Sequence, residues 1–210
     1  MHSPTVSTAR LAVPGKASGE YQKGCGAFKG RRLAEAEEHL RKAIGIYPDY
    51  SAAWVVLGQV LGAQHKQDEA RDACERAKAV DPDYVPPYVC LADFAAVEND
   101  WEQVASLSKR ALELEPLTNM YSLYYSACAA FHLKDLGGAE ARATSAIKLD
   151  TWHRLPELHL LLAHVYEATG DLHAEIAQLR EYVKSAPNSQ ESNEVKVTLA
   201  QLEARSAKQQ

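Results

Sequence analysis

Cysteine is scarce in this sequence, and its spacing argues against two kinds of small stabilised domain. The chain holds four cysteines, Cys25, Cys74, Cys90 and Cys128, which are irregularly spaced and include no CxxC pair. Neither a disulfide framework nor a zinc ribbon is therefore predicted. Free cysteines favour a cytoplasmic location, and the periplasm is the alternative if the chain is a piece of an exported protein.

A basic excess and a long apolar run are also missing. The 23 Lys and Arg residues are outnumbered by 28 Asp and Glu residues, so the formal net charge is −5. No basic cluster indicates a nucleic-acid-binding face. No apolar stretch approaches the roughly eighteen residues that a membrane-spanning helix needs, and no secretory signal pattern opens the sequence. A hydrophobic content of 46% is enough for a core in one or two domains.

What the sequence does contain is a repeat. The segment YPDYSAAW at 47–54 returns as DPDYVPPY at 81–88, and Pro48, Pro82 and Pro116 are each 34 residues apart. Two further markers, Thr151 and Pro187, continue the frame at intervals of 35 and 36 residues. Five repeat units are therefore expected, at 17–50, 51–84, 85–118, 119–153 and 154–188.

Within a unit, the apolar residues follow the period of a helix. In the second unit Trp54, Leu57, Gly58 and Leu61 lie at i, i+3, i+4 and i+7, which is one stripe of a helix. A second stripe follows the polar segment QHKQD, and Pro82 ends it because proline lacks the amide hydrogen and clashes with the preceding turn. Each unit is predicted to be two antiparallel helices joined by a tight turn.

This pattern resembles the tetratricopeptide repeat family. The second unit follows the family signature through Trp54, Leu57, Gly58, Leu61, Ala70, Cys74 and Pro82, with leucine and cysteine where the family has tyrosine and phenylalanine. The resemblance implies an all-α fold, a right-handed superhelical α-solenoid of about five helix-turn-helix units. The repeat array of this sequence is similar to C-terminal repeat arrays of larger bacterial proteins, and a match of that kind would make this chain a fragment.

Gly58 needs a structural reason, because a glycine inside a helix costs about 1 kcal/mol relative to alanine. We expect the two helices of a unit to cross closely at Gly58, where a small residue lets the backbones approach. The equivalent small residues on the other first helices are Gly24, Ala92, Ala127 and Ala163. On the second helices, Val104 and Glu175 depart from the small residue expected there.

The two ends of the chain depart from the repeat. Residues 1–16 have no helical period and are expected to be extended or disordered, or to be the end of an upstream domain. Residues 189–205 carry three apolar residues at i, i+4 and i+7 opposite a charged face. They are predicted to form a capping helix that covers the last repeat, followed by a tail at 206–210.

No arrangement of catalytic or metal-binding residues is recognisable. His153, His159, His164 and His173 lie close in sequence, but they form no HExxH motif and diverge around their helices. No GxSxG, Walker or dinucleotide-binding glycine motif occurs. The sequence therefore predicts no enzyme activity, no catalytic residue, no cofactor and no bound metal.

The family resemblance implies that the first helices line a concave groove that holds a partner. Helix geometry assigns to this groove Val55, Gln59, Val89, Asp93, Tyr121, Tyr124, Tyr125, Cys128, Phe131, Leu160 and His164. The lysine, asparagine and arginine clamp by which some family members grip a terminal carboxylate is not matched. Tyrosine is instead concentrated on the first helix of the fourth unit, and tyrosine-rich patches are typical of interface hot spots.

These features predict a non-catalytic scaffold that binds a protein or peptide, and neither nucleic acid nor a membrane span. The alternative is a structural or oligomerisation module. In that case the groove packs on an upstream domain of the same protein or on a second copy in a homodimer.

Overall fold

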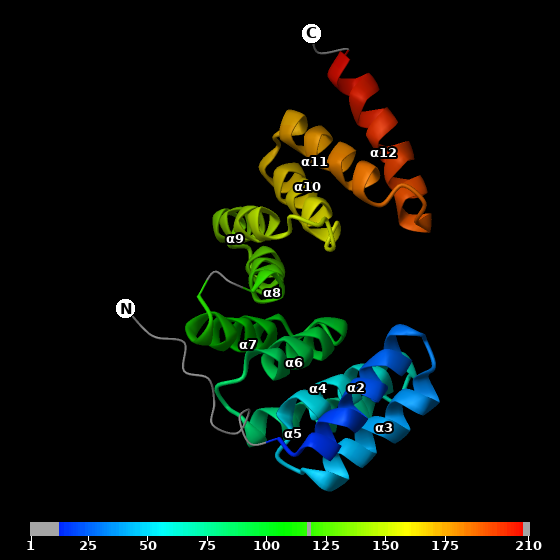
Figure 1. Cartoon of the computed structure of the whole chain (residues 1–210). Coiled ribbons are helices and arrows are strands. Elements are labelled where there is room, and N and C mark those ends of the chain that lie inside the picture. The colour runs from blue at the N-terminus through cyan, green and yellow to red at the C-terminus, as the bar shows by residue number, and fades with distance from the viewer. Residues whose placement is uncertain (1–12, 117–118, 208–210) are drawn as a thin grey trace. The chain divides into compact units, whose positions relative to one another are not determined.

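The computed structural model describes residues 13–116 and 119–207. Within these ranges the chain forms eleven helices and no strand, which confirms the prediction of an all-α helical repeat (Figure 1). The helices fall into two compact units, Met1–Asn99 and Asp100–Gln210. The predicted extended segment at 1–16 lies outside the described residues except for its last four positions, and α2 already begins at Gly15.

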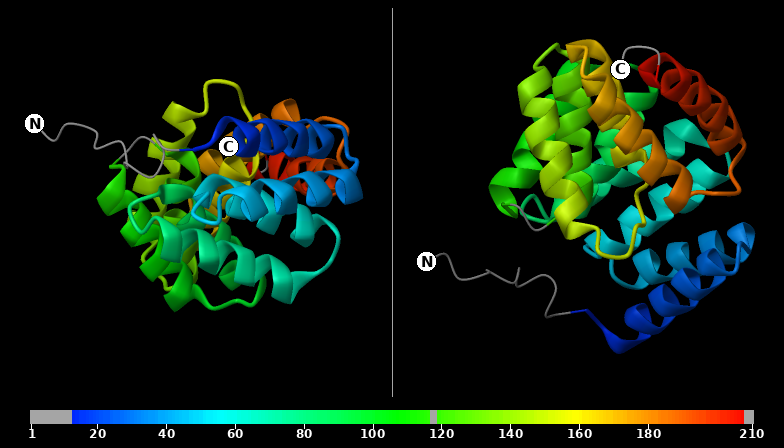
Figure 2. Two further views of the ribbon diagram at one scale, coloured as in Figure 1. Left: turned by 60° about the horizontal axis from the view of Figure 1, so that its bottom comes forward. Right: turned by 90° about the horizontal axis from the view of Figure 1, so that it is seen from above.

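Unit 1 consists of consecutive antiparallel helices (Figure 2). They are α2 (Gly15–Lys29), α3 (Leu33–Ile46), α4 (Ser51–Ala63), α5 (Gln67–Val80) and α6 (Val85–Val97). The apolar stripes of α2 to α5 form one core cluster that includes Leu40, Leu57 and Leu61. Trp54 packs against this cluster and donates its indole N–H to the carbonyl of Pro48 at 2.8 Å, which fastens the loop before α4 to the helix.

Unit 2 continues the same alternation. Its helices are α7 (Trp101–Leu114), α8 (Met120–His132), α9 (Leu136–Leu149), α10 (Glu157–Thr169), α11 (Leu172–Ser185) and α12 (Gln190–Ala207). Aspartate side chains cap the N-termini of α7, α9 and α11. Asp100, Asp135 and Asp171 each accept a hydrogen bond from the backbone N–H three residues later. None of the helices in the described ranges is long and apolar enough to cross a membrane.

A residue with left-handed backbone geometry closes the turn between the two helices of every repeat. These residues are Arg31, His65, Asn99, Lys134 and Gly170, with φ between 57° and 78°. Their spacings of 34, 34, 35 and 36 residues match those of the repeat markers. Only the last of these residues is a glycine, the residue type that adopts a left-handed backbone most easily. At the other four positions the flanking helices impose the turn geometry.

The small residues of the first helices are buried, and at Gly24 and Gly58 the second helix of the repeat packs closely against them. Gly24, Gly58, Ala92, Ala127 and Ala163 are all in the interior. A Cβ atom added to Gly58 would lie 2.5 Å from Cys74 Sγ and 3.0 Å from the Ala70 carbonyl oxygen. The backbone of α4 therefore approaches α5 so closely that alanine does not fit without a shift, which explains the glycine.

Two of the four cysteines are joined, contrary to the expectation from the sequence. Cys74 of α5 and Cys90 of α6 form a disulfide across a Cα–Cα distance of 6.2 Å, while Cys25 and Cys128 are free. The spacing of the cysteines does not indicate this pair, because the two meet only when the second helix of one repeat packs on the first helix of the next. Because two of the four cysteines are bonded, the cysteines do not favour a cytoplasmic location.

The last helix packs on α11 through polar contacts at its two ends. Arg180 donates to the carboxylate of Glu203 at 2.6 and 2.9 Å. Tyr182, which is buried, donates its hydroxyl to Glu191 at 2.8 Å. These contacts hold α12 against α11.

Candidate functional site

The predicted groove residues of unit 1 divide into surface and interior positions. Gln59 of α4 and Asp93 of α6 are exposed, and Val89 of α6 is half-buried. Val55 is only 4% exposed, so the expectation that it lines a groove is wrong for this residue. The helical period assigns Val55 and Gln59 to the same side of α4, but the side chain of Val55 is covered by neighbouring helices.

A tyrosine cluster in unit 1 was not among the predicted site residues. The rings of Tyr21 and Tyr50 lie 4.9 Å apart between centroids, and Tyr47 lies 6.2 Å from Tyr50. Burial, assisted by a hydrogen bond with Cys25, raises the pKa of Tyr21 well above its usual range, and Tyr84 contributes to the same effect. The cluster thus draws residues from two successive repeats, 17–50 and 51–84. Its signal in the sequence was the repeated Pro-Asp-Tyr at 48–50 and 82–84.

The predicted aromatic residues of α8 lie at the surface of unit 2 rather than inside it. Tyr121 is 41% exposed, while Tyr124 and Tyr125 are half-buried with their rings edge to face at 5.2 Å. Phe131 is also half-buried, and like Tyr124 it packs against the core cluster shared by α8, α9 and α10. The core thus holds these rings in place from one side while their other edges remain accessible.

The remaining predicted residues of unit 2 are Cys128, Leu160 and His164. Leu160 is half-buried and His164 is exposed, with the imidazole of His164 6.2 Å from the ring of Phe131. Cys128 is half-buried, and burial raises the pKa of its thiol to about 11. A thiol with such a pKa is protonated at neutral pH, so Cys128 contributes apolar surface rather than a nucleophile.

Two further aromatic residues, Trp101 of α7 and His132 of α8, continue this aromatic surface. The ring of His132 stacks on Trp101 of α7 at 3.6 Å with an interplanar angle of 5°, and it meets Phe131 edge to face at 5.4 Å. Burial lowers the pKa of His132, which favours the neutral ring. Neither Trp101 nor His132 belongs to a recurring motif, so the sequence offered no signal for their contact. We call the surface formed by Trp101, Tyr121, Tyr124, Tyr125, Phe131, His132 and His164 the aromatic row.

Two histidines outside the aromatic row have structural partners. His39 shares a hydrogen bond of 2.7 Å with Glu20, and His159 shares one of 2.8 Å with Gln178. Among the residues that the structure describes, no three His, Cys, Asp or Glu side chains converge on a point that could hold a metal ion. The arrangement that is present consists of accessible aromatic edges on α7, α8 and α10, a kind of surface that suits contact with another molecule.

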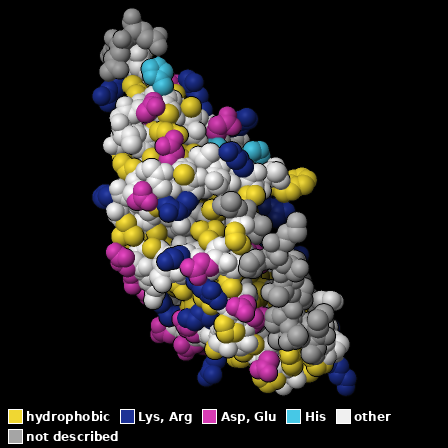
Figure 3. Space-filling view, turned by 90° about the vertical axis from the view of Figure 1, so that its left-hand side faces the viewer, with side chains coloured by type: hydrophobic (Ala, Val, Ile, Leu, Met, Phe, Trp, Pro, Cys, Tyr) yellow, Lys and Arg dark blue, Asp and Glu magenta, His cyan; other side chains and the backbone are white. Residues whose placement is uncertain are grey.

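Charge is distributed rather than concentrated on the surface. Figure 3 shows Lys and Arg side chains interspersed with Asp and Glu over the face that it presents, with apolar side chains between them. Many of the charges are paired, as in the Arg41 bridges to Glu37 at 2.8 Å and to Glu69 at 2.9 Å. A continuous basic strip of the kind that follows a nucleic-acid backbone is not visible among the described side chains of this face.

Comparison with known proteins gives one consistent family. Two segments, residues 27–91 and residues 156–189, match family models described as tetratricopeptide repeat. Comparison with curated protein sequences finds no significant match.

Solved structures of similar architecture cover most of this chain at low sequence identity. A thermophilic tetratricopeptide repeat protein of Thermus thermophilus is 20% identical, with 89% of this chain and 98% of that chain covered and a TM-score of 0.67. PilW, a widely conserved type IV pilus biogenesis factor, is 16% identical, with 91% and 87% covered and a TM-score of 0.77. YrrB, a tetratricopeptide repeat protein with an unusual peptide-binding site, is 13% identical, with 90% and 98% covered and a TM-score of 0.61.

Proposed function

This chain is a tetratricopeptide repeat protein, and we propose that it is a non-catalytic scaffold that binds a protein or peptide on the aromatic row of unit 2. Tetratricopeptide repeats are in general protein–protein interaction scaffolds. The observation that carries the specific assignment is the placement of Tyr121, Tyr124 and Tyr125 on one helix with accessible edges. A helix that served only to pack between its neighbours would bury such rings.

Two aromatic side chains of the row are held in place by the core before a partner binds. Tyr124 and Phe131 are packed against the core on one side, so binding a partner does not require these side chains to be ordered. Tyrosine also offers a large apolar ring together with a hydroxyl that hydrogen-bonds, and it has few rotatable bonds to immobilise. The row therefore suits a peptide that presents both apolar side chains and backbone polar groups.

Electrostatics has a minor part in this binding. The predicted row residues are uncharged apart from the histidines, and the pKa of His132 is lowered by burial. Binding dominated by apolar and hydrogen-bonding contacts is weakly screened by salt. We expect the complex to persist at high ionic strength.

The test begins with a photo-crosslinking residue placed at Tyr121, with the same residue at the exposed Val97 of unit 1 as the control. A partner captured from position 121 and not from position 97 is then purified, and its affinity is measured for the unmodified chain and for the Tyr124→Ala/Tyr125→Ala variant. We expect a loss of about 2 kcal/mol or more, roughly 30-fold in affinity, with the helix content retained.

Two results would contradict the assignment. Unchanged affinity in the double variant, or binding that disappears at moderate salt, would place the partner elsewhere on the chain. Light scattering adds a third check: a concentration-dependent dimer that the same variant dissociates would mean that the row holds a second copy, and the protein would then be an oligomerisation module.

A further inference from the structure

The turn between α9 and α10 displays a tryptophan to solvent. Trp152 is 79% exposed, which is more than any other large hydrophobic residue in the described part of the chain. The other two tryptophans, Trp54 and Trp101, are half-buried. Exposed indole surface of this extent is uncommon on a folded domain, and tryptophan is among the residues most enriched at interface hot spots.

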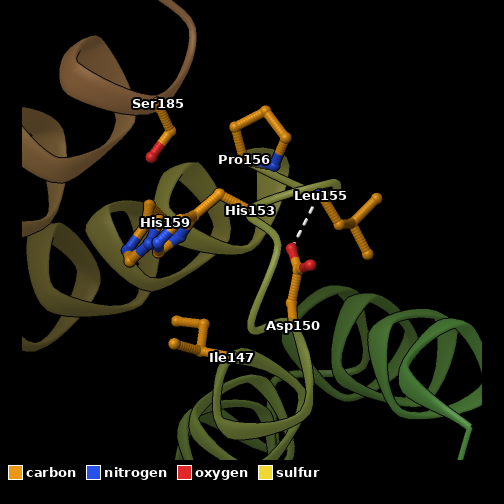
Figure 4. A pocket seen from close by; sticks show the side chains of 7 residues that line it. All are labelled: Ile147, Asp150, His153, Leu155, Pro156, His159 and Ser185. Atoms are coloured by element: carbon orange, nitrogen blue, oxygen red, sulfur yellow. Dashed lines mark hydrogen bonds between the residues drawn. The ribbon is translucent and has the colours of Figure 1, made fainter.

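The turn that carries Trp152 is held rigidly. Asp150 is buried, and its two carboxylate oxygens accept hydrogen bonds from the backbone N–H groups of Arg154 and Leu155, each at 2.8 Å; Figure 4 shows the bond to Leu155. His153 has a φ of 49°, the one left-handed non-glycine residue outside the regular repeat turns in the described ranges. Because the backbone of the turn is already fixed, binding does not require this backbone to be ordered.

The space between the turn and the helices next to it is almost completely filled by side chains. Ile147, Leu155, Pro156 and His159 surround a cavity of about 10 Å³ (Figure 4), which has room for one water molecule and no side chain. A partner therefore cannot insert a side chain under the turn. The indole must instead project into a hollow that the partner provides, and the exposed Leu149 adds apolar contact beside it.

The exposed charged residues nearest Trp152 in the sequence are both basic. Lys148 and Arg154 flank it in sequence, and both are exposed. Neither has an ion-pair partner among the described residues. The acid within the turn, Asp150, is buried and committed to two backbone hydrogen bonds, so the nearest exposed carboxylate in the sequence is that of Glu157 in α10. On a chain with a formal net charge of −5, the two exposed charged residues nearest this tryptophan in the sequence are thus both positive.

We propose that the turn at 149–154 is a second docking site, separate from the aromatic row, and that its occupant is an acidic protein segment with an apolar hollow. The indole of Trp152 is buried in that hollow, and Lys148 and Arg154 pair with carboxylates around its rim. Complementary charges at the rim speed association and select the partner, while the buried indole supplies most of the affinity.

The probe is a helical hairpin peptide with an apolar groove between its two helices and glutamates along the groove edges. Its matched control carries lysines in place of the glutamates. Binding is followed by tryptophan fluorescence, because an indole that leaves water shifts its emission to the blue and is protected from acrylamide quenching. We expect the glutamate peptide to bind and the lysine peptide to bind at least 10-fold more weakly.

Variants identify the residues responsible. Trp152→Ala abolishes the fluorescence change, so its affinity is measured by calorimetry and should fall at least 10-fold. Lys148→Glu/Arg154→Glu should weaken binding of the glutamate peptide to a similar degree and reverse the preference toward the lysine peptide. Val197→Ala on α12, where the valine is 60% exposed, is the matched control and should bind as the unmodified chain does.

Four outcomes would overturn the proposal. The two peptides could bind equally, or Trp152→Ala could retain full affinity for the glutamate peptide. Binding of anionic phospholipid vesicles that depends on Trp152, without binding of the glutamate peptide, would make the turn a membrane contact. A dimer that Trp152→Ala dissociates would make the occupant a second copy. Tyr124→Ala/Tyr125→Ala should leave peptide binding at this turn unchanged, so failure here is distinguishable from failure of the aromatic row.

Discussion

Replacing Gly58 by alanine tests whether close helix crossing explains the glycine. The added Cβ would lie 2.5 Å from Cys74 Sγ and 3.0 Å from the carbonyl oxygen of Ala70. The sulfur cannot rotate away, because it is bonded to Cys90, and the carbonyl belongs to the backbone of α5. The helices themselves must therefore move apart to admit one methyl group.

Two terms of opposite sign decide the result. Alanine in the middle of α4 gains about 1 kcal/mol of helix propensity over glycine. Overpacking a tight core costs about 1–3 kcal/mol, and the upper part of that range applies where neither neighbour can yield. The sum is a net destabilisation of about 1–2 kcal/mol, which corresponds to a fall in melting temperature of about 2–8 °C for a chain of this size.

Two other glycines provide the controls for a series measured by urea and thermal unfolding with circular dichroism. Gly26 lies inside α2, and a Cβ added there would meet no neighbouring atom within 4 Å, so Gly26→Ala should stabilise by up to about 1 kcal/mol. At Gly24 the nearest atom is Leu40 Cγ at 2.7 Å, on a side chain that can adjust, so Gly24→Ala should fall between the two. If Gly58→Ala raised the melting temperature as much as Gly26→Ala, the close-crossing explanation would be refuted.

The other expectations concern the disulfide and the half-buried carboxyl of Glu175. Thiol titration of the denatured, unreduced chain should give two free thiols, Cys25 and Cys128. Reduction of the disulfide should lower the free energy of unfolding by about 3 kcal/mol, as expected for a closed loop of this length. Four thiols in the absence of reductant would exclude the bond. Burial, and then the nearby Glu167, raise the pKa of Glu175 above its ordinary value. A carboxyl of this kind stabilises the fold below its unfolded pKa and loses that contribution as the pH rises through the folded pKa. Glu175→Gln should therefore stabilise the protein at neutral pH, with an advantage that shrinks in acid; a constant difference across pH would point to another cause.

Periodicity alone determined the helical framework. Apolar residues at i, i+3, i+4 and i+7 require a helix to share one face, and a recurrence of 34 residues requires the same pair of helices again and again. The small residues at Gly58 and Ala92 were identified for the same reason, since an equivalent position in each repeat meets an equivalent neighbour. These features depend on local sequence and on the repeat, both of which can be read along the chain.

Only tertiary packing decided which side chains are exposed and which are buried. Val55 and Gln59 share a side of α4, yet one is covered and the other is exposed. Cys74 and Cys90 form no motif and meet because consecutive repeats stack. Trp54 folds back onto its own loop, whereas Trp152 is held away from the core by a turn that Asp150 fixes from inside. A helical period gives the direction of a side chain around its own axis, but burial depends on which other helix occupies that direction, and that is settled only when the whole unit packs together.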